Sequence, residues 1–204
     1  MQLRTQNIAF RYGKEPWLFK NVNFTVDPGE IVGLVGPSGY GKTTFCRILA
    51  GYEVPNKGSV ALNGRPIKSK RKGYHPVQLV FQHPEKAINP RWKMGKVLNE
   101  GWQPDQQLLD ALGIEEEWLT RFPNELSGGE LQRFCVARAL GPDTRYLIAD
   151  EMTTMLDAIT QAQIWKAVLK IAEQREMGII VVSHEVNLIQ QLCHRVIEID
   201  HLNT

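Results

Sequence analysis

Cysteine is scarce in this chain: among its 204 residues there are three, Cys46, Cys135 and Cys193, far apart in the sequence. A small, odd, scattered set fits neither a disulfide framework nor a metal-ligand cluster. We interpret the three as buried or incidental thiols of a reducing compartment. Long apolar runs are also missing, since no stretch approaches the roughly 20 residues of a membrane span. Residues 1–7 lack the apolar core of a signal peptide.

An excess of charge of one sign is absent too. The 24 Lys and Arg residues nearly balance the 22 Asp and Glu residues, leaving a net charge of +2. This balance provides no general attraction to nucleic acid or anionic lipid, so we expect no nucleic-acid partner. The sequence also has no internal repeat, low-complexity tract or heptad run. A hydrophobic content of 43% fits one globular domain over residues 1–204.

A glycine-rich segment fits the phosphate-binding pattern G-x-x-x-x-G-K-[ST]. It consists of Gly36, Pro37, Ser38, Gly39, Tyr40, Gly41, Lys42 and Thr43. The apolar run Glu30–Val35 before it predicts a buried strand, and Thr44–Ala50 after it predicts a helix. Strand, loop and helix form the context that this motif requires. We therefore expect this segment and Thr44 to bind the phosphates of a nucleoside triphosphate.

The chemistry of such a loop follows from its residues. Glycines let successive backbone N–H groups point inward around an anion, and the following helix adds the positive end of its dipole. Lys42 supplies a charge for the β- and γ-phosphates, and Thr43 supplies a hydroxyl for Mg²⁺. Tyr40 is bulky, but a side chain that points outward leaves the backbone free to bind. The alternative, a glycine-rich turn without a ligand, gives no reason for the Lys-Thr pair.

Strands alternate with helices along the rest of the chain. Predicted strands are Ile8–Tyr12, Val22–Val26, Gly58–Gly64 (ending in an Asn-Gly hairpin signal), Val77–Phe81, Tyr146–Asp150, Ile179–Ser183 and Val196–Ile199. Predicted helices follow Ser127 and cover Thr160–Glu173 and Val186–Cys193. We predict an α/β fold: a P-loop NTPase core with a mainly parallel sheet, and a small N-terminal antiparallel β subdomain.

The segment of about 84–125 has a different texture. Prolines and glycines punctuate short helical stretches, and three of the five tryptophans, Trp92, Trp102 and Trp118, lie here. We interpret it as a helical subdomain inserted into the core. Its aromatic residues either form the subdomain's own core or an exposed patch for a partner. The basic run Lys68–Gly73 is interpreted as a solvated loop, with a phosphate- or lipid-contacting patch as the alternative.

An apolar strand ends in two acidic residues, Asp150 and Glu151. Ligands of parallel sheets bind beyond the carboxyl ends of the strands, so both acids are expected beside the phosphate loop. Asp150 suits a Mg²⁺ site, and Glu151 suits the orientation of the water that attacks the γ-phosphate. Alone, such a pair also fits surface or helix-capping acids; the phosphate loop makes the catalytic interpretation the stronger one.

Ser127, Gly128, Gly129 and Glu130 follow Leu126 at the start of a predicted helix. Ser127 and Glu130 have the spacing of a capping box, and the two glycines allow another surface to approach closely. An ordinary capped helix is one interpretation. An exposed helix N-terminus that binds an anion is the other.

These motifs together resemble those of the ATP-binding-cassette ATPases, and the resemblance covers nearly the whole chain. Leu126–Arg133 is similar to the signature motif of that family. The resemblance implies the ABC ATPase fold, ATP and Mg²⁺ as cofactors, and two ATPase domains paired head to tail. It then assigns Ser127, Gly128, Gly129 and Glu130 to the ATP held by the partner's phosphate loop.

Other positions take their expected roles from the resemblance alone. Tyr12 matches the aromatic that stacks on adenine, and Gln82 matches the glutamine that contacts Mg²⁺ and links the core to the helical insertion. Asp157 matches the loop acid that crosses the dimer interface, and His184 matches the histidine that contacts the γ-phosphate. Catalytic roles are thus expected for Glu151, His184, Lys42 and Gln82, and metal binding for Thr43, Gln82 and Asp150.

Two stretches, Phe81–Arg91 and Thr154–Ile164, are similar to importers of oligopeptides, dipeptides and nickel. The resemblance implies an ATPase on the inner face of the cell membrane that docks on permease subunits through residues 82–102. The second ATPase subunit is either a copy of this chain or a different one. Met152 departs from the family, which usually has Pro there. The chain ends at Thr204, short of an extra C-terminal segment that often indicates the substrate class in this group.

Three other classes fit the sequence less well. Cassette ATPases of DNA repair carry long coiled coils between phosphate loop and signature, and this chain has none. Translation and regulatory cassette proteins usually contain two cassettes, and this chain has one. A nucleotide-binding module without turnover would not need Asp150, Glu151 and His184.

Overall fold

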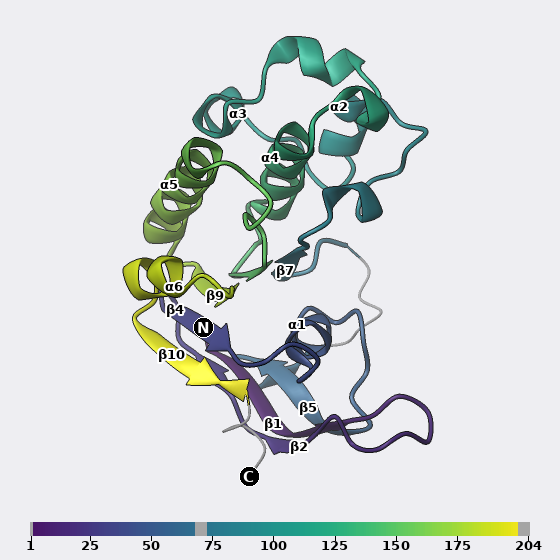
Figure 1. Cartoon of the computed structure of the whole chain (residues 1–204), viewed down its shortest axis with the longest axis vertical. Coiled ribbons are helices and arrows are strands. Elements are labelled where there is room, and N and C mark those ends of the chain that lie inside the picture. Colours follow the sequence, from purple (N-terminus) through teal and green to yellow (C-terminus); the bar gives the residue numbers. More distant parts are fainter. Residues whose placement is uncertain (1, 68–72, 200–204) are drawn as a thin grey trace.

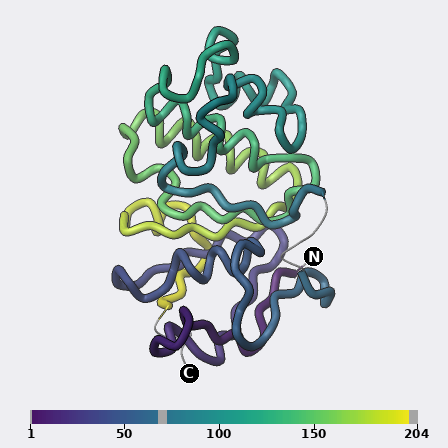
Figure 2. Tube along the Cα trace, turned by 90° about the vertical axis from the view of Figure 1, so that its right-hand side faces the viewer, coloured from purple at the N-terminus to yellow at the C-terminus, as the bar shows by residue number. Residues whose placement is uncertain are grey.

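The computed structural model describes residues 2–67 and 73–199. Residues 68–72, most of the predicted basic loop, lie outside the described residues. These described residues form two five-stranded sheets and a group of helices (Figure 1). In the second view the helical residues around 84–140 form one end of the molecule, and the N-terminal strands form the other (Figure 2). The predicted α/β fold is confirmed.

The central sheet has the strand order β10-β4-β9-β8-β7, and every neighbouring pair is parallel. Its members are β4 (Ile31–Val35), β7 (Val77–Val80), β8 (Tyr146–Asp150), β9 (Gly178–Val182) and β10 (Arg195–Glu198). In the register, Asp150 and Leu34 both pair with Val182. The carboxyl ends of β4, β9 and β8 therefore lie side by side at one edge of the sheet, which is where the predicted site residues are found.

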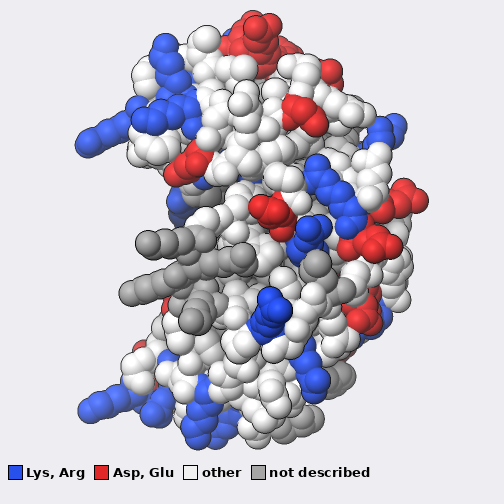
Figure 3. Space-filling view, turned by 180° about the vertical axis from the view of Figure 1, so that it is seen from behind, with Lys and Arg blue, Asp and Glu red and all other residues white. Residues whose placement is uncertain are grey.

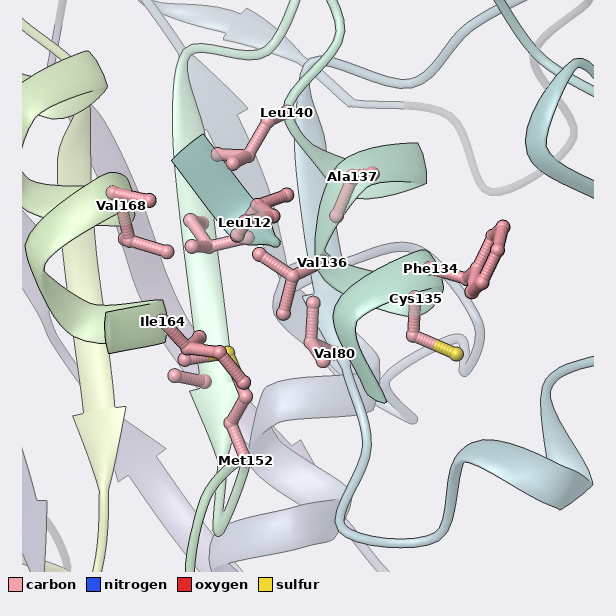
Figure 4. Close-up of a cluster of buried hydrophobic side chains, with 14 of the residues drawn as sticks. Val80, Leu112, Phe134, Cys135, Val136, Ala137, Leu140, Met152, Ile164 and Val168 are labelled. Atoms are coloured by element: carbon pink, nitrogen blue, oxygen red, sulfur yellow. The ribbon is translucent and has the colours of Figure 1, made fainter. Parts of the chain in front are cut away.

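Side chains alternate between the two faces of this sheet. In β8, Leu147 and Ala149 belong to one buried cluster, whereas Tyr146 and Ile148 belong to the other. The first cluster packs the sheet against α4 (Gly128–Ala139) and α5 (Ala158–Arg175), and Figure 4 shows part of it. The second packs it against α1 (Lys42–Leu49) and the antiparallel sheet. Helix α6 (Val186–Leu192) completes the cover.

The antiparallel sheet contains β1 (Leu3–Phe10), β2 (Phe19–Val22), β3 (Thr25–Val26), β5 (Lys57–Leu62) and β6 (Arg65–Pro66). The predicted strand Ile8–Tyr12 was wrong at both ends. The observed strand β1 ends at Phe10 and begins at Leu3, because Leu3 and Thr5 are buried alternately with exposed neighbours. The predicted Val22–Val26 is two short strands. The Asn-Gly hairpin is confirmed: Asn63 and Gly64 have φ values of 53° and 71° and join β5 to β6.

Between β7 and α4 the chain forms only helical elements. They are η1 (Pro84–Lys86), α2 (Met94–Leu98), α3 (Gln106–Leu112), η2 (Glu116–Thr120) and η3 (Pro123–Glu125). Trp118 is buried, and Trp92 and Trp102 are half-buried against the same cluster. The aromatic residues of this segment thus act mainly as core. The short helix α2 was not predicted.

Trp17 anchors the loop between β1 and β2. The guanidinium of Arg11 lies 4.7 Å from the centre of its ring, and the amines of Lys20 and Lys57 lie at 5.7 and 5.8 Å. Cations over an indole face are attracted to its π electrons. Seen from behind, Lys and Arg side chains predominate at the end of the molecule formed by the antiparallel sheet. Acidic and basic side chains are mixed over the helical end (Figure 3). These contacts hold the loop that carries Tyr12.

Candidate functional site

Loops after neighbouring parallel strands build one pocket of about 280 Å³. It is lined by Tyr12, Leu18, Ser38, Gly39, Gly41, Lys42, Thr43, Thr44, Glu151 and His184. The phosphate loop follows β4, Glu151 follows β8, and His184 follows β9. Because these three strands are adjacent, residues more than a hundred positions apart in the sequence face one small volume. The structure thus brings Tyr12, Glu151 and His184 to the phosphate loop, whereas Gln82, Asp157 and the Ser127–Glu130 segment lie outside this lining.

The phosphate loop depends on its glycines. Gly36, Gly39 and Gly41 have φ values of 144°, 86° and 91°, which L side chains rarely adopt. A Cβ at Gly41 would also lie 2.8 Å from the side chain of Leu18. Gly41 is the N-cap of α1, so the first turn of that helix opens into the pocket.

Lys42 is buried, with only 7% of its surface exposed. Its Nζ donates hydrogen bonds to the carbonyl oxygens of Gly36 and Pro37, at 2.7 and 2.9 Å. These bonds fold the lysine back across the loop, and Lys42 lines the pocket. The helix was predicted from Thr44 but begins at Lys42, since the lysine already belongs to the first turn.

Thr43 and Asp150 meet beside the loop. The Thr43 hydroxyl donates a hydrogen bond to the Asp150 carboxylate, which is 6% exposed. Burial raises the pKa of Asp150, and the charge of Glu151 adds to that rise, whereas the Thr43 hydroxyl and the nearby cations Arg47 and Lys42 oppose it. A carboxylate and a hydroxyl side by side are oxygen ligands of the kind that Mg²⁺ takes.

Glu151 has an unusual backbone. Its φ is 51°, a left-handed conformation that costs on the order of 1–3 kcal/mol for a residue with a side chain. Two contacts hold it: its N–H donates to the Val182 carbonyl at 2.9 Å, and its carbonyl accepts from the Thr154 hydroxyl at 2.9 Å. The turn aims the carboxylate sideways at β9, where its Oε1 lies 3.2 Å from Nε2 of His184.

Gln82 stands apart from the pocket lining. It follows β7 at the edge of the sheet and is half-buried. Its Nε2 lies 3.5 Å from the Thr154 hydroxyl, which is itself bonded to the Glu151 carbonyl. Gln82 therefore connects to Glu151 through one threonine, a link that the sequence did not reveal.

Tyr12 lies at the rim of the pocket. The residue is 45% exposed, and its ring packs edge-on against Phe10, with centroids 4.9 Å apart. Its hydroxyl pairs with the Thr44 hydroxyl at 2.9 Å. The hydroxyl pair fixes the ring relative to α1, and the predicted contact of Tyr12 with a flat base stays a prediction.

Ser127 begins α4 through the predicted capping box. The Glu130 backbone N–H donates to the Ser127 hydroxyl at 3.3 Å, and the Ser127 N–H donates to the Glu130 carboxylate at 2.6 Å. Ser127 and Gly128 are exposed, and nothing lies within 4 Å of a Cβ built on Gly128. None of the described residues that line the pocket comes from α4. The signature segment is thus an open helix N-terminus outside this chain's own pocket.

Asp157 is the exposed N-cap of α5. Its carboxylate accepts hydrogen bonds from the N–H groups of Ile159 and Thr160, both at 3.0 Å. The hydrogen bonds from Thr160 contribute most to lowering the pKa of Asp157, and the bond from Ile159 adds to the effect. The predicted helix Thr160–Glu173 begins two residues earlier, at Ala158, because Asp157 caps it.

Sequence reasoning missed three supporting residues: Leu18, Gln132 and Thr154. Leu18 closes the pocket beside Gly41, and Thr154 holds the Glu151 turn. Gln132, inside α4, donates to the carbonyls of Phe81 and Met152. Thr154 and Gln132 both lie inside motifs that the sequence highlighted, but their long-range partners leave no local pattern.

Comparisons with known proteins agree with this geometry. The family model described as ABC transporter matches residues 19–154, which include the phosphate loop, the signature segment and both acids. The nickel import ATP-binding protein NikE of Rhodospirillum rubrum is 35% identical over 193 residues, covering 86% of this chain and 70% of that protein. NikE of Escherichia coli K12 is 33% identical over 201 residues, covering 90% of this chain and 75% of that protein.

Solved structures give the same result. The dimeric post-hydrolysis structure of the ATP-binding cassette MJ0796, bound to ADP and Pi, is 26% identical. It has a TM-score of 0.78 and covers 96% of this chain and 93% of that chain. An ATP-binding subunit of an ABC transporter has the same fold, with a TM-score of 0.84 at 20% identity, over 97% of this chain and 85% of that chain. The chain therefore belongs to the ABC transporter family, as an ATP-binding ATPase subunit.

Proposed function

We propose that this chain hydrolyses ATP with Mg²⁺ at the pocket described above, and that hydrolysis drives import through a membrane permease. The observation that carries the proposal is the convergence of Lys42, Thr43, Glu151 and His184 on one 280 Å³ pocket. Phosphoryl transfer requires positioning and charge stabilisation, and this set supplies both.

Each residue would have one task. The backbone N–H groups of the loop and the Lys42 amine bind the β- and γ-phosphates. The Thr43 hydroxyl and Asp150 would hold Mg²⁺, with Gln82 as a further oxygen ligand, and the bound ion would supply positive charge next to the phosphates. Glu151 orients the attacking water, and His184 contacts the γ-phosphate while restraining Glu151. Tyr12 stacks on adenine.

The pocket is incomplete in a single chain, which supports a head-to-tail dimer. Ser127 and Gly128 are exposed at the start of α4 but do not line their own chain's pocket. Exposed apolar side chains lie next to the phosphate loop, Asp157 and His184. They are Tyr40 at 48%, Met155 at 68%, Ile159 at 82% and Val186 at 65% exposure. A second ATPase subunit that covers them would bring its own signature helix to this pocket.

The transported substrate is proposed as a nickel or metal complex, or a peptide, on the basis of the NikE relatives. Permease docking is proposed at residues 82–102. A second cavity of about 460 Å³ borders this segment at Ala87, Glu100 and Gly101, and the rest of its lining comes mainly from β7 and its neighbours and from α4. Within residues 2–67 and 73–199, no helix is long and apolar enough to cross a bilayer. We also propose that the permease holds the chain at the inner face of the membrane.

The test is ATP hydrolysis by the purified chain in Mg²⁺ and in EDTA, with and without Glu151→Gln. Hydrolysis that requires Mg²⁺ and falls at least a hundredfold in the variant, with ATP still bound, supports the proposal. Equal turnover of the variant contradicts the role of Glu151. Uptake of ⁶³Ni or of labelled dipeptides by cells with and without the chain then separates the substrate classes.

A further inference from the structure

Gln132 is a buried amide in an unusual position. It lies one turn into α4, with 1% of its surface exposed. Its Nε2 donates to the Phe81 carbonyl at 3.0 Å and to the Met152 carbonyl at 2.8 Å. Phe81 immediately precedes Gln82, and Met152 immediately follows Glu151. One side chain of the signature helix thus holds the backbone on both loops that carry the reaction.

The orientation of this amide is fixed. Its NH₂ group faces two carbonyl oxygens, so rotating the amide by half a turn would place Oε1 against both acceptors. Oε1 itself has no hydrogen-bond partner among the residues that the structure describes. A buried acceptor without a partner costs stability. An apolar side chain of similar size would avoid that cost but could not tie the two loops together.

The surroundings make the two bonds strong. Val80 precedes Phe81 in the sequence, and Val136 lies one turn beyond Gln132 on α4; both belong with Met152 to one buried apolar cluster, and Figure 4 shows Val80 close to Val136. Hydrogen bonds in such low-dielectric surroundings are stronger than in water. A shift of α4 relative to the sheet therefore moves both loops or breaks both bonds.

We propose that Gln132 is a positioning residue that couples the signature helix to Gln82 and Glu151. The N-terminus of α4 carries Ser127, and the same rigid helix carries Gln132 one turn later. Contact of Ser127 with an ATP in the partner subunit would set the position of α4, and Gln132 would pass that position to the hydrolytic residues. This inference rests on the proposed function, because it presupposes the roles of Gln82 and Glu151.

The test substitutes Gln132→Met, which keeps the length and removes the donor. The matched control is Thr5→Val, since Thr5 is also 1% exposed and also pairs with two backbone groups, Val22 O and Phe24 N. Thr5 lies in the antiparallel sheet. For both variants and the unsubstituted chain, kcat, KM, the affinity for a fluorescent ATP analogue and the melting temperature are measured.

The expected result is a kcat at least tenfold lower in Gln132→Met, with nucleotide affinity within about twofold of the unsubstituted chain. Thr5→Val should lower the melting temperature comparably and leave kcat within about twofold. An unchanged kcat in Gln132→Met, or an equal fall in both variants, overturns the proposal and leaves Gln132 a structural brace. If Gln132→Met does not fold, Gln132→Asn is measured in its place. Asparagine keeps the amide, but its side chain is too short to reach the Phe81 and Met152 carbonyls together, so kcat should fall and an unchanged kcat overturns the proposal.

Glu151→Gln, measured in parallel, separates the two proposals. Loss of turnover in Glu151→Gln with normal kcat in Gln132→Met overturns only the coupling role. Normal turnover in Glu151→Gln overturns the assignment of Glu151 and, with it, the basis of the coupling.

Discussion

Oε1 of Glu151 lies 3.2 Å from Nε2 of His184, across two neighbouring parallel strands. The Glu151 side chain is 22% exposed and that of His184 is 53% exposed, so the pair stands at the boundary between core and pocket. The left-handed turn at Glu151 makes the contact possible, because it redirects the carboxylate toward β9. The pair defines the point where the attacking water is proposed to sit.

Removal of the histidine tests this relationship. We expect His184→Ala to lower kcat at least tenfold and to change KM for ATP much less, because Glu151 loses its restraint while Lys42 and the loop still bind phosphates. His184→Gln retains a donor and should lose less. Steady-state kinetics measure both values. Equal kcat in His184→Ala and the unsubstituted chain would show that the contact has no part in turnover.

Lys42 is expected to govern nucleotide affinity. Among the described residues that line the pocket, Lys42 is the only lysine or arginine, and Lys42→Ala removes its charge. We expect the affinity for ATP to fall at least tenfold, measured by titration with a fluorescent analogue. Lys166→Ala, an exposed lysine on α5, is the control and should bind normally. Similar affinities in the two variants would remove Lys42 from the phosphate site.

The buried charge of Asp150 should lower the stability of the fold although the proposed Mg²⁺ site requires it. Its raised pKa means that the fold disfavours the charged form, so ionisation at neutral pH costs stability. Below the ordinary pKa of an aspartate, both folded and unfolded chains hold the proton and the cost vanishes. The cost grows as pH rises from that value, where the unfolded chain loses its proton, and it is complete above the raised pKa of the folded chain. Asp150→Asn should therefore raise the melting temperature at pH 7.5, and the gain should shrink toward pH 4.5.

The same variant should lose Mg²⁺-dependent hydrolysis. Thermal unfolding at the two pH values and ATPase assays on one preparation test both halves. A lower melting temperature at pH 7.5 would mean that the Thr43 hydrogen bond and the nearby cations outweigh burial.

Met152→Pro should be tolerated. No hydrogen bond from the Met152 backbone N–H is found among the described residues, and the carbonyl that accepts from Gln132 remains. Proline stabilises by about 0.4–1 kcal/mol through the unfolded chain, but the buried Met152 side chain, which lies beside Ile164 in Figure 4, is lost. We expect a melting temperature a few degrees lower and kcat within about threefold. A tenfold loss of kcat would show that Met152 itself shapes the site.

Local chemistry explains what the sequence could predict. The phosphate loop, the acids at the end of β8 and the Ser127–Glu130 capping box are each encoded within a few residues, and the fold follows from their alternation with apolar strands. The bounds of β1 were wrong because the buried residues of its first half alternate with polar ones. The Thr154 and Gln132 contacts join residues far apart in the chain, so only the packed structure reveals them.

The most direct test of the account measures the Mg²⁺-dependent ATPase rate per chain against protein concentration, with Glu151→Gln as the control. The account predicts a rate that rises with concentration, or on addition of the partner subunits, and that vanishes in the variant, because the signature helix of a second subunit completes each pocket. A rate per chain that is high and independent of concentration in a verified monomer would contradict it.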